Sequence, residues 1–518
     1  ELENYRHLFI ITNGIIRDKN GIDQTWNILY KLGIYCENFV RYDKKFLPFK
    51  QEKSKEKLIS FLNERFPDNN NNEIVDNFYS SISTGFKYED CLISDNYSTI
   101  ILSYKKIELD NTPVPCPSCM TTIQQGNSFP EMFLRSYECK NPNCPDRSKS
   151  GRGKRFDEFG IYRYCKLIED EECNQISYEL YEKWRRDIFD CNNDIYEMLI
   201  KYYSWGGEKI SIYPNYNKEY SFDREIILWK YNNKSGKNHY ANYETLPIVD
   251  FFNSIKKLLV RDTGNKILTD SISIFNEDSA KGIRSLLTGQ IGAAITSPPY
   301  YNAREYSQWQ TLIMYLIDMM INGAAVYDTL QNNSFYLYNI GDIVNSDNVF
   351  VESNMSKRRL PLGFLSCMFF ELVGFNLVGN IIWDKGQVQS KRNSTVNLNS
   401  GYIKCINCYE HVFILKKGIA NPNEQLSTIK SFSPVIKINS KGINTYKHTA
   451  PYPPEMVDLL KPFISNESYI LDPFLGSGTT VLWCKNNNFK GIGFELNSEY
   501  YKLCKERIFE KDIFPQLF

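Results

Sequence analysis

Histidine is scarce in this chain of 518 residues, which contains only four. They stand far apart in the sequence, at His7, His239, His411 and His448. Chemistry that depends on several histidine ligands, or on a histidine acting as a base, is therefore disfavoured from the start.

Long apolar runs and an excess of one charge are also missing. No run approaches membrane-spanning length, and no secretory leader precedes the first folded segment. The first residue is Glu1, so a missing N-terminal segment stays an open alternative. Without an export signal a cytoplasmic protein is expected, whose 14 cysteines are thiols or metal ligands. Lys+Arg and Asp+Glu both number 61, which neither supports nor excludes a nucleic-acid partner.

The length of the chain predicts several domains, and its composition changes from one part to the next. Helical and β-rich stretches come first, and a Cys-, Pro- and Gly-rich texture follows. We expect an α+β region at 1–105, a zinc-ribbon-like module at 106–165, a mainly helical region at 166–245 and a catalytic domain at 246–518.

Short apolar strands alternate with helical stretches in the last of these regions. Examples of the strands are "IGAAITSPPY", "SFYLYNI", "YILDPF" and "KGIGFEL". This alternation predicts a mostly parallel sheet with helices on both faces. The expected fold class is therefore α/β, with a Rossmann-like sheet in the C-terminal half.

One strand runs into a glycine-rich turn in "YILDPFLGSGTT". Gly476 and Gly478 let the backbone approach a ligand closely and adopt turn conformations that other residues avoid. The next strand ends in Glu495, about twenty residues downstream, where an acid hydrogen-bonds ribose hydroxyls in nucleotide-binding units. Together these segments predict an adenosine site. A phosphate cradle is disfavoured, because the turn lacks a third glycine and a lysine.

A rigid elbow follows another strand, in "TSPPYYN" at residues 296–302. With "DPFLGSGTT" and "GFEL", it resembles the S-adenosylmethionine-dependent DNA amino-methyltransferases. That family has a [Ser/Asn/Asp]-Pro-Pro-[Tyr/Phe] catalytic motif and a Phe-x-Gly-x-Gly cofactor motif. The segments "NIIWDK", "CYEHVFILKK" and "HTAPYPPEMVDLLKPF" extend the resemblance over roughly residues 265 to 510. Because the catalytic motif comes first, the chain resembles the permuted β group.

The resemblance implies methyl transfer to an exocyclic amino group of a base that is rotated out of the duplex. Such a nitrogen is a poor nucleophile, and acceptors on its hydrogens favour the reactive, pyramidal form. By resemblance these acceptors are the Ser297 side chain and the Pro298 carbonyl. Pro298 and Pro299 stiffen the elbow, and Tyr300 stacks on the base.

The resemblance also implies a set of cofactor contacts for S-adenosylmethionine. They are Asp472, Phe474, Gly476, Gly478, Thr479, Thr480, Glu495, Asp278, His448 and Tyr452. For Asp278, contact with the adenine and capping of the following helix are two open interpretations.

The first residue of the catalytic motif carries information about the target base. Serine is more usual in the cytosine-N4 enzymes, so Ser297 favours cytosine N4, with adenine N6 as the alternative. The expected substrate is double-stranded DNA in a prokaryotic restriction-modification system, with a separate cognate endonuclease. A non-catalytic DNA-binding protein of the same fold and an RNA methyltransferase are further alternatives. A nuclease in this chain is disfavoured, because Ser103 stands where its second acid should be.

Two cysteine pairs mark the second region: Cys116 with Cys119, and Cys139 with Cys144. Each pair lies in a Pro- or Asn-rich turn that can present two thiolates to one tetrahedral ion. We expect a structural zinc ion, since four thiolates leave no open coordination position. Free thiols in two loops are the alternative.

Basic residues around these cysteines are suited to phosphate contacts, although a solvated loop is the alternative. The predicted DNA contacts are Arg147, Lys149, Arg152, Lys154, Arg155, Lys391 and Arg392. Another Cys-x-x-Cys, Cys405–Cys408, runs directly into an apolar strand and is expected to be buried without a metal.

The chain departs from the permuted family in one respect. Related enzymes usually carry a target-recognition domain between the "EHVF" strand and the "HTAPYPP" segment, where this chain has only about thirty residues. We therefore expect the first 245 residues, zinc module included, to supply much of the sequence recognition.

Overall fold

A computed structural model describes most of the chain. The described residues are 2, 6–19, 21, 23–37, 49–80, 86–106, 115–126, 136–157, 174–212, 224–228, 243–303, 307–345, 358–386, 398–400, 403, 405–419, 433–438, 453–464 and 467–509. Among them, no helix combines the length and apolar character needed to cross a bilayer.

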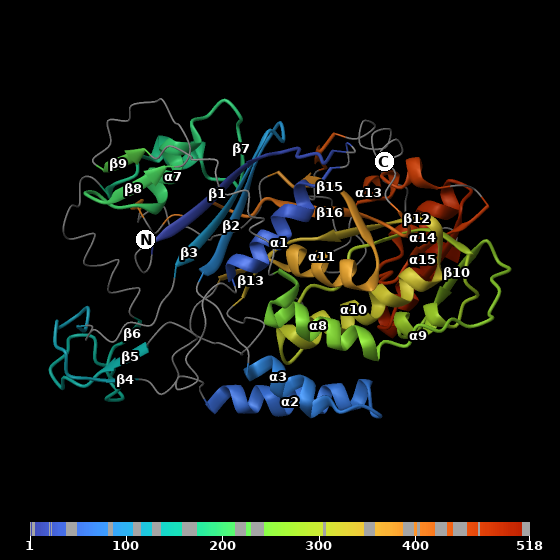
Figure 1. Ribbon diagram of the computed structural model, residues 1–518, viewed down its shortest axis with the longest axis horizontal. Coiled ribbons are helices and arrows are strands. Elements are labelled where there is room, and N and C mark those ends of the chain that lie inside the picture. The colour runs from blue at the N-terminus through green and yellow to red at the C-terminus, as the bar shows by residue number, and fades with distance from the viewer. Residues whose placement is uncertain are drawn as a thin grey trace.

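An eight-stranded sheet forms the centre of the C-terminal half, in the order β10-β19-β18-β11-β12-β16-β15-β17 (Figure 1). β16 runs antiparallel to both of its neighbours, and the other pairings are parallel. The α/β class predicted from the sequence is confirmed. The strands are β10 (Ile272–Phe275), β11 (Ile291–Thr296), β12 (Leu330–Ile340), β15 (Asn376–Asp384), β16 (Tyr409–Lys416), β17 (Val435–Lys437), β18 (Tyr469–Asp472) and β19 (Lys490–Phe494).

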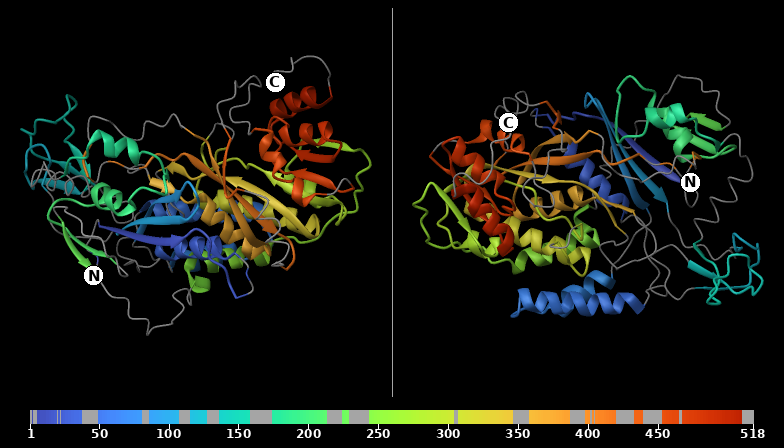
Figure 2. Two further views of the ribbon diagram at one scale, coloured as in Figure 1. Left: turned by 90° about the horizontal axis from the view of Figure 1, so that it is seen from above. Right: turned by 180° about the vertical axis from the view of Figure 1, so that it is seen from behind.

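Helices cover both faces of this sheet, and turned views show them on opposite sides (Figure 2). Successive strand residues enter different cores: Ala294 packs with α9, α10 and α11, whereas Ala293 packs with α13 and α14. Burial on both faces explains the continuous apolar strands. The helices are α8 (Pro247–Leu258), α9 (Ser279–Arg284), α10 (Leu312–Thr329), α11 (Leu362–Val373), α13 (Glu455–Asp458), η3 (Lys461–Phe463), α14 (Thr479–Asn486) and α15 (Ser498–Phe509).

The N-terminal region forms a second sheet, in the order β1-β3-β2-β7. Its core is continuous with that of the catalytic region: Trp26 of α1 and Tyr104 of β3 lie in the same buried cluster as Phe364 of α11. The described residues of segment 1–105 therefore share a core with the C-terminal half. These elements are β1 (His7–Asn13), α1 (Thr25–Glu37), α2 (Phe49–Arg65), α3 (Asn71–Ser80), β2 (Phe86–Ser94), β3 (Thr99–Lys106) and β7 (Ile188–Phe189).

Residues 166–245 mix helices with strands, so the expectation of a mainly helical region is too simple. Ile188 and Phe189 extend the N-terminal sheet by pairing with β2, and α6 and α7 pack on its other face through Trp184 and Tyr202. Two further strand pairs are β8–β9 and β13–β14. The bounds are α6 (Tyr178–Lys183), α7 (Ile195–Tyr203), β8 (Lys209–Ile212), β9 (Glu225–Leu228), η2 (Tyr243–Thr245), β13 (Ile343–Asn345) and β14 (Arg358–Leu360).

Charged side chains are buried where the two larger sheets meet. Arg359, 1% exposed, forms ion pairs with Asp90 of β2 and with Asp187, each at 3.3 Å. Next to them, the Tyr88 hydroxyl donates to the Asp342 carboxylate at 2.8 Å. These contacts link β2 and the residue before β7 to β14 and to the segment after β12, so the N-terminal sheet and the C-terminal half are joined by buried polar contacts as well as by a shared core.

A small antiparallel sheet lies apart from the two larger ones (Figure 1), in the order β4-β5-β6. Its buried clusters draw only on its own segment: Tyr137 packs with Phe156, and the cysteines pack together. The segment is therefore a separate module. Its strands are β4 (Gln124–Gly126), β5 (Ser136–Cys139) and β6 (Arg155–Asp157).

Candidate active site

The ends of two neighbouring strands bring the two sequence motifs together. β11 ends at Thr296 and β18 ends at Asp472, and the strands are parallel partners. The Thr296 hydroxyl donates to the Asp472 carboxylate at 2.6 Å, and both residues are fully buried. The Ser-Pro-Pro-Tyr elbow and the glycine-rich turn therefore start side by side, at the carboxyl edge where open α/β sheets bind ligands.

Asp472 shapes the glycine-rich turn from within. Its carboxylate also accepts hydrogen bonds from the Phe474 amide, at 3.1 Å, and from the Thr480 hydroxyl. Asp472, Thr479 and Thr480 are buried, whereas Phe474 and Gly476 are partly exposed. Of the cofactor contacts predicted in this turn, Phe474 and Gly476 are thus the accessible ones.

The two glycines of the turn adopt conformations that other residues rarely take. Gly476 has φ 54° and Gly478 has φ 86°. A Cβ on Gly478 would also lie 2.6 Å from the Cys504 sulfur, closer than real contacts allow. Glycine is therefore required at Gly478 by both backbone and packing.

Glu495 ties the end of β19 to this turn. Its carboxylate accepts hydrogen bonds from the amides of Gly476 and Asn497, each at 2.8 Å. Burial raises the pKa of Glu495 above its usual value, although these amides lower it. Asn276, which the sequence did not single out, donates to the Glu495 carbonyl at 2.8 Å and so joins the ends of β10 and β19.

Asp278 caps the helix that follows β10. Its side chain accepts a hydrogen bond from the Lys281 amide at 3.0 Å, at the N-terminus of α9. The capping interpretation is thereby confirmed. Asp278 is also exposed, and its contact with an adenine stays a prediction.

The catalytic elbow exposes part of its surface. Pro298 is buried, whereas Ser297, Pro299 and Tyr300 are partly exposed. Tyr301 is buried, with its ring centroid 5.8 Å from that of Tyr315 in α10. Tyr301 thus anchors the elbow in the core, and its neighbour Tyr300 packs against the same core while staying partly exposed.

Asn302 fixes the turn after the elbow in a left-handed conformation, with φ 48°. Its side-chain amide donates to the Trp309 carbonyl at 3.1 Å, and its oxygen accepts from the Trp309 amide at 2.8 Å. An Asn shortly after a Pro-Pro-Tyr-Tyr run was a sequence signal for this turn.

Four predicted site residues lie outside the described part of the chain: His448, Tyr452, Lys391 and Arg392. Their roles stay predictions. His411 of β16 is described and buried, and burial lowers its pKa to about 3. It therefore stays neutral at physiological pH and is a weak base.

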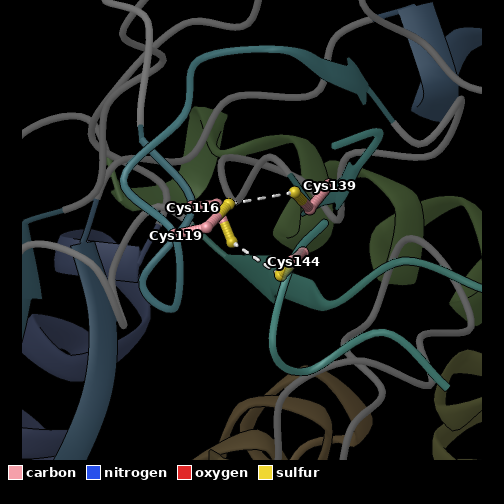
Figure 3. Close-up of side chains that lie close together, drawn as sticks. All are labelled: Cys116, Cys119, Cys139 and Cys144. Atoms are coloured by element: carbon pink, nitrogen blue, oxygen red, sulfur yellow. Dashed lines mark hydrogen bonds between the residues drawn. The ribbon is translucent and has the colours of Figure 1, made fainter. Parts of the chain in front are cut away.

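The four predicted metal ligands point toward one centre (Figure 3). Their sulfur atoms all lie within 4.8 Å of one another, with 3.9 Å between Cys116 and Cys144 and 3.6 Å between Cys119 and Cys139. Such distances are far too long for disulfides and match the edges of a tetrahedron with metal–sulfur bonds of about 2.3 Å. The donor set and its geometry fit zinc.

Cys405 and Cys408 do not belong to this cluster. Both are buried, and the Cys405 thiol donates to the Trp184 carbonyl at 3.3 Å. The Cys408 amide donates to Asp187 at 2.9 Å. The prediction that both cysteines are buried is confirmed.

The basic residues of the module differ in how they are engaged. Lys154 pairs with Asp146 at 2.9 Å, and Arg155 lies 3.9 Å from Glu138. Arg147 is partly buried and donates to a backbone carbonyl within the module. Lys149 and Arg152 are exposed and form no ion pair with any described residue, so they are the cations most accessible to a phosphate.

Comparison with known families identifies the region that contains both motifs. A family model described as DNA methylase matches residues 291–506. These residues form a DNA methylase domain. The match runs from β11 into α15 and includes every strand of the eight-stranded sheet except β10.

Curated relatives of the chain include three type II methyltransferases. M.BslI of Bacillus sp. (strain NEB-606), a type II beta methyltransferase, is 36% identical over 489 residues, which are 83% of this chain and 53% of that protein. The chain thus spans about half the length of this relative. M.XycI of Xanthomonas campestris pv. cyanopsidis (25% identical) and M.SmaI of Serratia marcescens (27%) each cover 46% of this chain, and 87% and 92% of their own length.

Solved structures resemble the DNA methylase domain only distantly. A putative DNA modification methylase from Thermus thermophilus covers 46% of this chain and 94% of its own. Its identity is 18% and its TM-score is 0.34.

Proposed function

We propose that the protein transfers a methyl group from S-adenosylmethionine to an exocyclic amino group of a base in double-stranded DNA. The observation that carries the proposal is the Thr296–Asp472 hydrogen bond, which brings the elbow and the glycine-rich turn to one sheet edge. The DNA methylase match and the names of the three relatives support the same reaction. A type II restriction-modification system with a separate endonuclease is the proposed setting.

In this proposal the elbow activates the amino nitrogen. The Ser297 hydroxyl and the Pro298 carbonyl accept its hydrogens and favour the pyramidal form that attacks. The partly exposed Tyr300 ring offers a face for the flipped base. S-adenosylmethionine supplies an electrophilic methyl group, and the chain's task is to hold the nitrogen in line with it.

The glycine-rich turn and Glu495 form the proposed cofactor site. Gly476 is partly exposed and has no side chain, so a ligand could approach its backbone closely. Phe474, which is also partly exposed, offers an apolar surface in the same turn. The Glu495 carboxylate would accept hydrogen bonds from the ribose hydroxyls. The remaining proposed contacts are Asp278, His448 and Tyr452, with Asp472, Gly478, Thr479 and Thr480 supporting the shape of the turn.

Cytosine N4 is the proposed target, because Ser297 occupies the first position of the catalytic motif. Adenine N6 is the alternative within the same reaction, since the same acceptors suit either amino group. A flipped base is proposed in both cases, because the amino nitrogen is not accessible inside a stacked duplex.

We further propose that Cys116, Cys119, Cys139 and Cys144 hold a structural zinc ion, supported by the distances between their sulfur atoms. The module around the ion would present its basic residues to DNA phosphates. Proposed contacts in the module are Arg147, Lys149, Arg152, Lys154 and Arg155, and Lys391 and Arg392 are proposed outside it.

Mass spectrometry of nucleosides tests this function. DNA incubated with the protein and S-adenosylmethionine should contain N4-methylcytosine, and Ser297→Ala should lower its formation by roughly 100-fold. Cofactor binding by the variant should be unchanged. Detection of N6-methyladenine would show that the target base is adenine, and the proposed type of reaction would stand. No methylated base on any DNA, with cofactor still bound, would contradict the proposed function.

A further inference from the structure

Tyr300 has a hydroxyl group whose surroundings the proposed reaction does not explain. The ring is partly exposed, but its oxygen is buried and has no well-formed hydrogen bond to a described residue. Three groups lie next to the oxygen: the Ser297 side chain, the Glu410 side chain and the Gly341 backbone. Of these three groups, the Glu410 carboxylate carries a negative charge, and a buried hydroxyl is stabilised by such an acceptor.

Glu410 of β16 is held in place from two sides. Its side chain crosses the backbone of Gly341, where a Cβ would lie 2.7 Å from the Glu410 Cγ atom. Lys385, just after β15, forms an ion pair with its carboxylate. Glu410 is only 9% exposed. The space left by the absent side chain of Gly341 and the ion pair with Lys385 thus hold the Glu410 carboxylate beside the elbow.

The Tyr300 hydroxyl keeps its proton in this environment. Burial, and next the negative charge of Glu410, raise the pKa of Tyr300 well above its usual value. A protonated phenol must donate, and a carboxylate is the strongest acceptor among the three neighbouring groups. Hydrogen bonds of catalytic groups are often loose in the free protein and tighten when the substrate binds.

We propose that Glu410 is a positioning residue for methyl transfer: its carboxylate accepts the Tyr300 hydroxyl when the base binds, and so fixes the ring on which the base stacks. The Ser297 hydroxyl lies beside the same oxygen. One contact would therefore orient both the stacking surface and a neighbouring acceptor of the amino group. This inference rests on the proposed function.

A double-mutant cycle tests the inference in the full chain. Tyr300→Phe keeps the ring and removes the hydroxyl, and Glu410→Gln keeps the shape and removes the charge. Each should lower the single-turnover rate of methyl transfer by roughly 10-fold to 100-fold, without changing cofactor affinity. The double variant should be no slower than the slower single variant, because both changes break one contact.

A second variant reaches the same contact without changing either partner. Gly341→Ala places a methyl group against the Glu410 side chain and should displace it from Tyr300. It should slow wild type, but not Tyr300→Phe. The inference would be overturned if the rate reductions caused by Glu410→Gln or Gly341→Ala multiplied with the reduction caused by Tyr300→Phe. Such a result would indicate general destabilisation. Absence of methyl transfer by wild type would instead reject the proposed function itself.

Discussion

Asp342 lies just after β12, where burial raises its pKa to about 6, although Arg359 and the Tyr88 hydroxyl lower it. A carboxyl with a raised pKa takes up a proton more readily in the folded protein than in the unfolded chain. Its contribution to stability is fully present below the unfolded value, near 3.8, and is lost as the pH rises through about 6. The ionised Asp342 carboxylate thus lowers the free energy of unfolding at neutral pH.

Asp342→Asn should remove this pH-dependent cost, because asparagine stays neutral and keeps an acceptor for Tyr88. We expect the stability of the variant, relative to wild type, to improve by roughly 1 to 3 kcal/mol between pH 4 and pH 7.5. Urea unfolding of both proteins across this range measures the difference. A difference that stays constant with pH would contradict the raised pKa.

At the scale of elements, the strands of the catalytic region could be predicted from the sequence. The apolar runs that end in Thr296 and Asp472 are β11 and β18, and those on either side of them in the sheet are also strands. Both faces of the sheet are buried, so the apolar signal is continuous and hard to miss. The short edge strand β17 (Val435–Lys437) was missed, because three residues carry no usable pattern.

The contacts between elements could not be predicted in the same way. Asp90 lies inside an apolar strand, in "YEDCLIS", and Arg359 follows a distant polar segment. A charge inside a strand indicates a buried partner, but nothing local shows which of the many basic residues that partner is. Glu410 and Asn276 were missed for the same reason, since their partners are remote in sequence.

Loss of the proposed zinc ion from the four-cysteine module should weaken DNA binding and leave cofactor binding unchanged. Cys116→Ser should leave β4, β5 and β6 without the zinc ion proposed for their centre, and the Tyr137–Phe156 contact alone cannot hold so small a sheet. DNA affinity should fall at least about tenfold, through lost phosphate contacts, while cofactor affinity stays within about twofold. Fluorescence anisotropy with DNA and calorimetry with the cofactor measure the two affinities.

Cys191→Ser is the matched control, because Cys191 is a free cysteine outside the cluster. It should bind DNA as wild type does. If Cys116→Ser binds no metal and its DNA affinity is still undiminished, the module does not take part in DNA recognition.

At the scale of the whole molecule, the N-terminal sheet and the catalytic sheet form one folded unit. Trp26 and Phe364 share one buried cluster, and Arg359 finds Asp90 and Asp187 across the boundary. A boundary near residue 245, drawn from composition, therefore separates residues that fold together.

A fragment of residues 246–518 should accordingly fail to fold. It would lose the ion pairs of Arg359 with Asp90 and Asp187 and would expose the apolar side chains of α11 where α1 now packs. Deletion of residues 115–157 alone should preserve cofactor binding and one cooperative transition. Circular dichroism on heating, with sedimentation to detect aggregates, measures both proteins. A monomeric 246–518 fragment with a sharp transition would contradict the shared core.

The module with the four cysteines stands, along the chain, between β3 and β7, two strands of the same sheet. A segment that leaves a sheet and returns to it can change in length or content at little cost, because the entropy of closing a loop grows slowly with its length. Evolution could thus exchange the module proposed to contact DNA for another one, while the catalytic core persists. Proteins with this core and different inserts at this point would then differ in target sequence and share one chemistry.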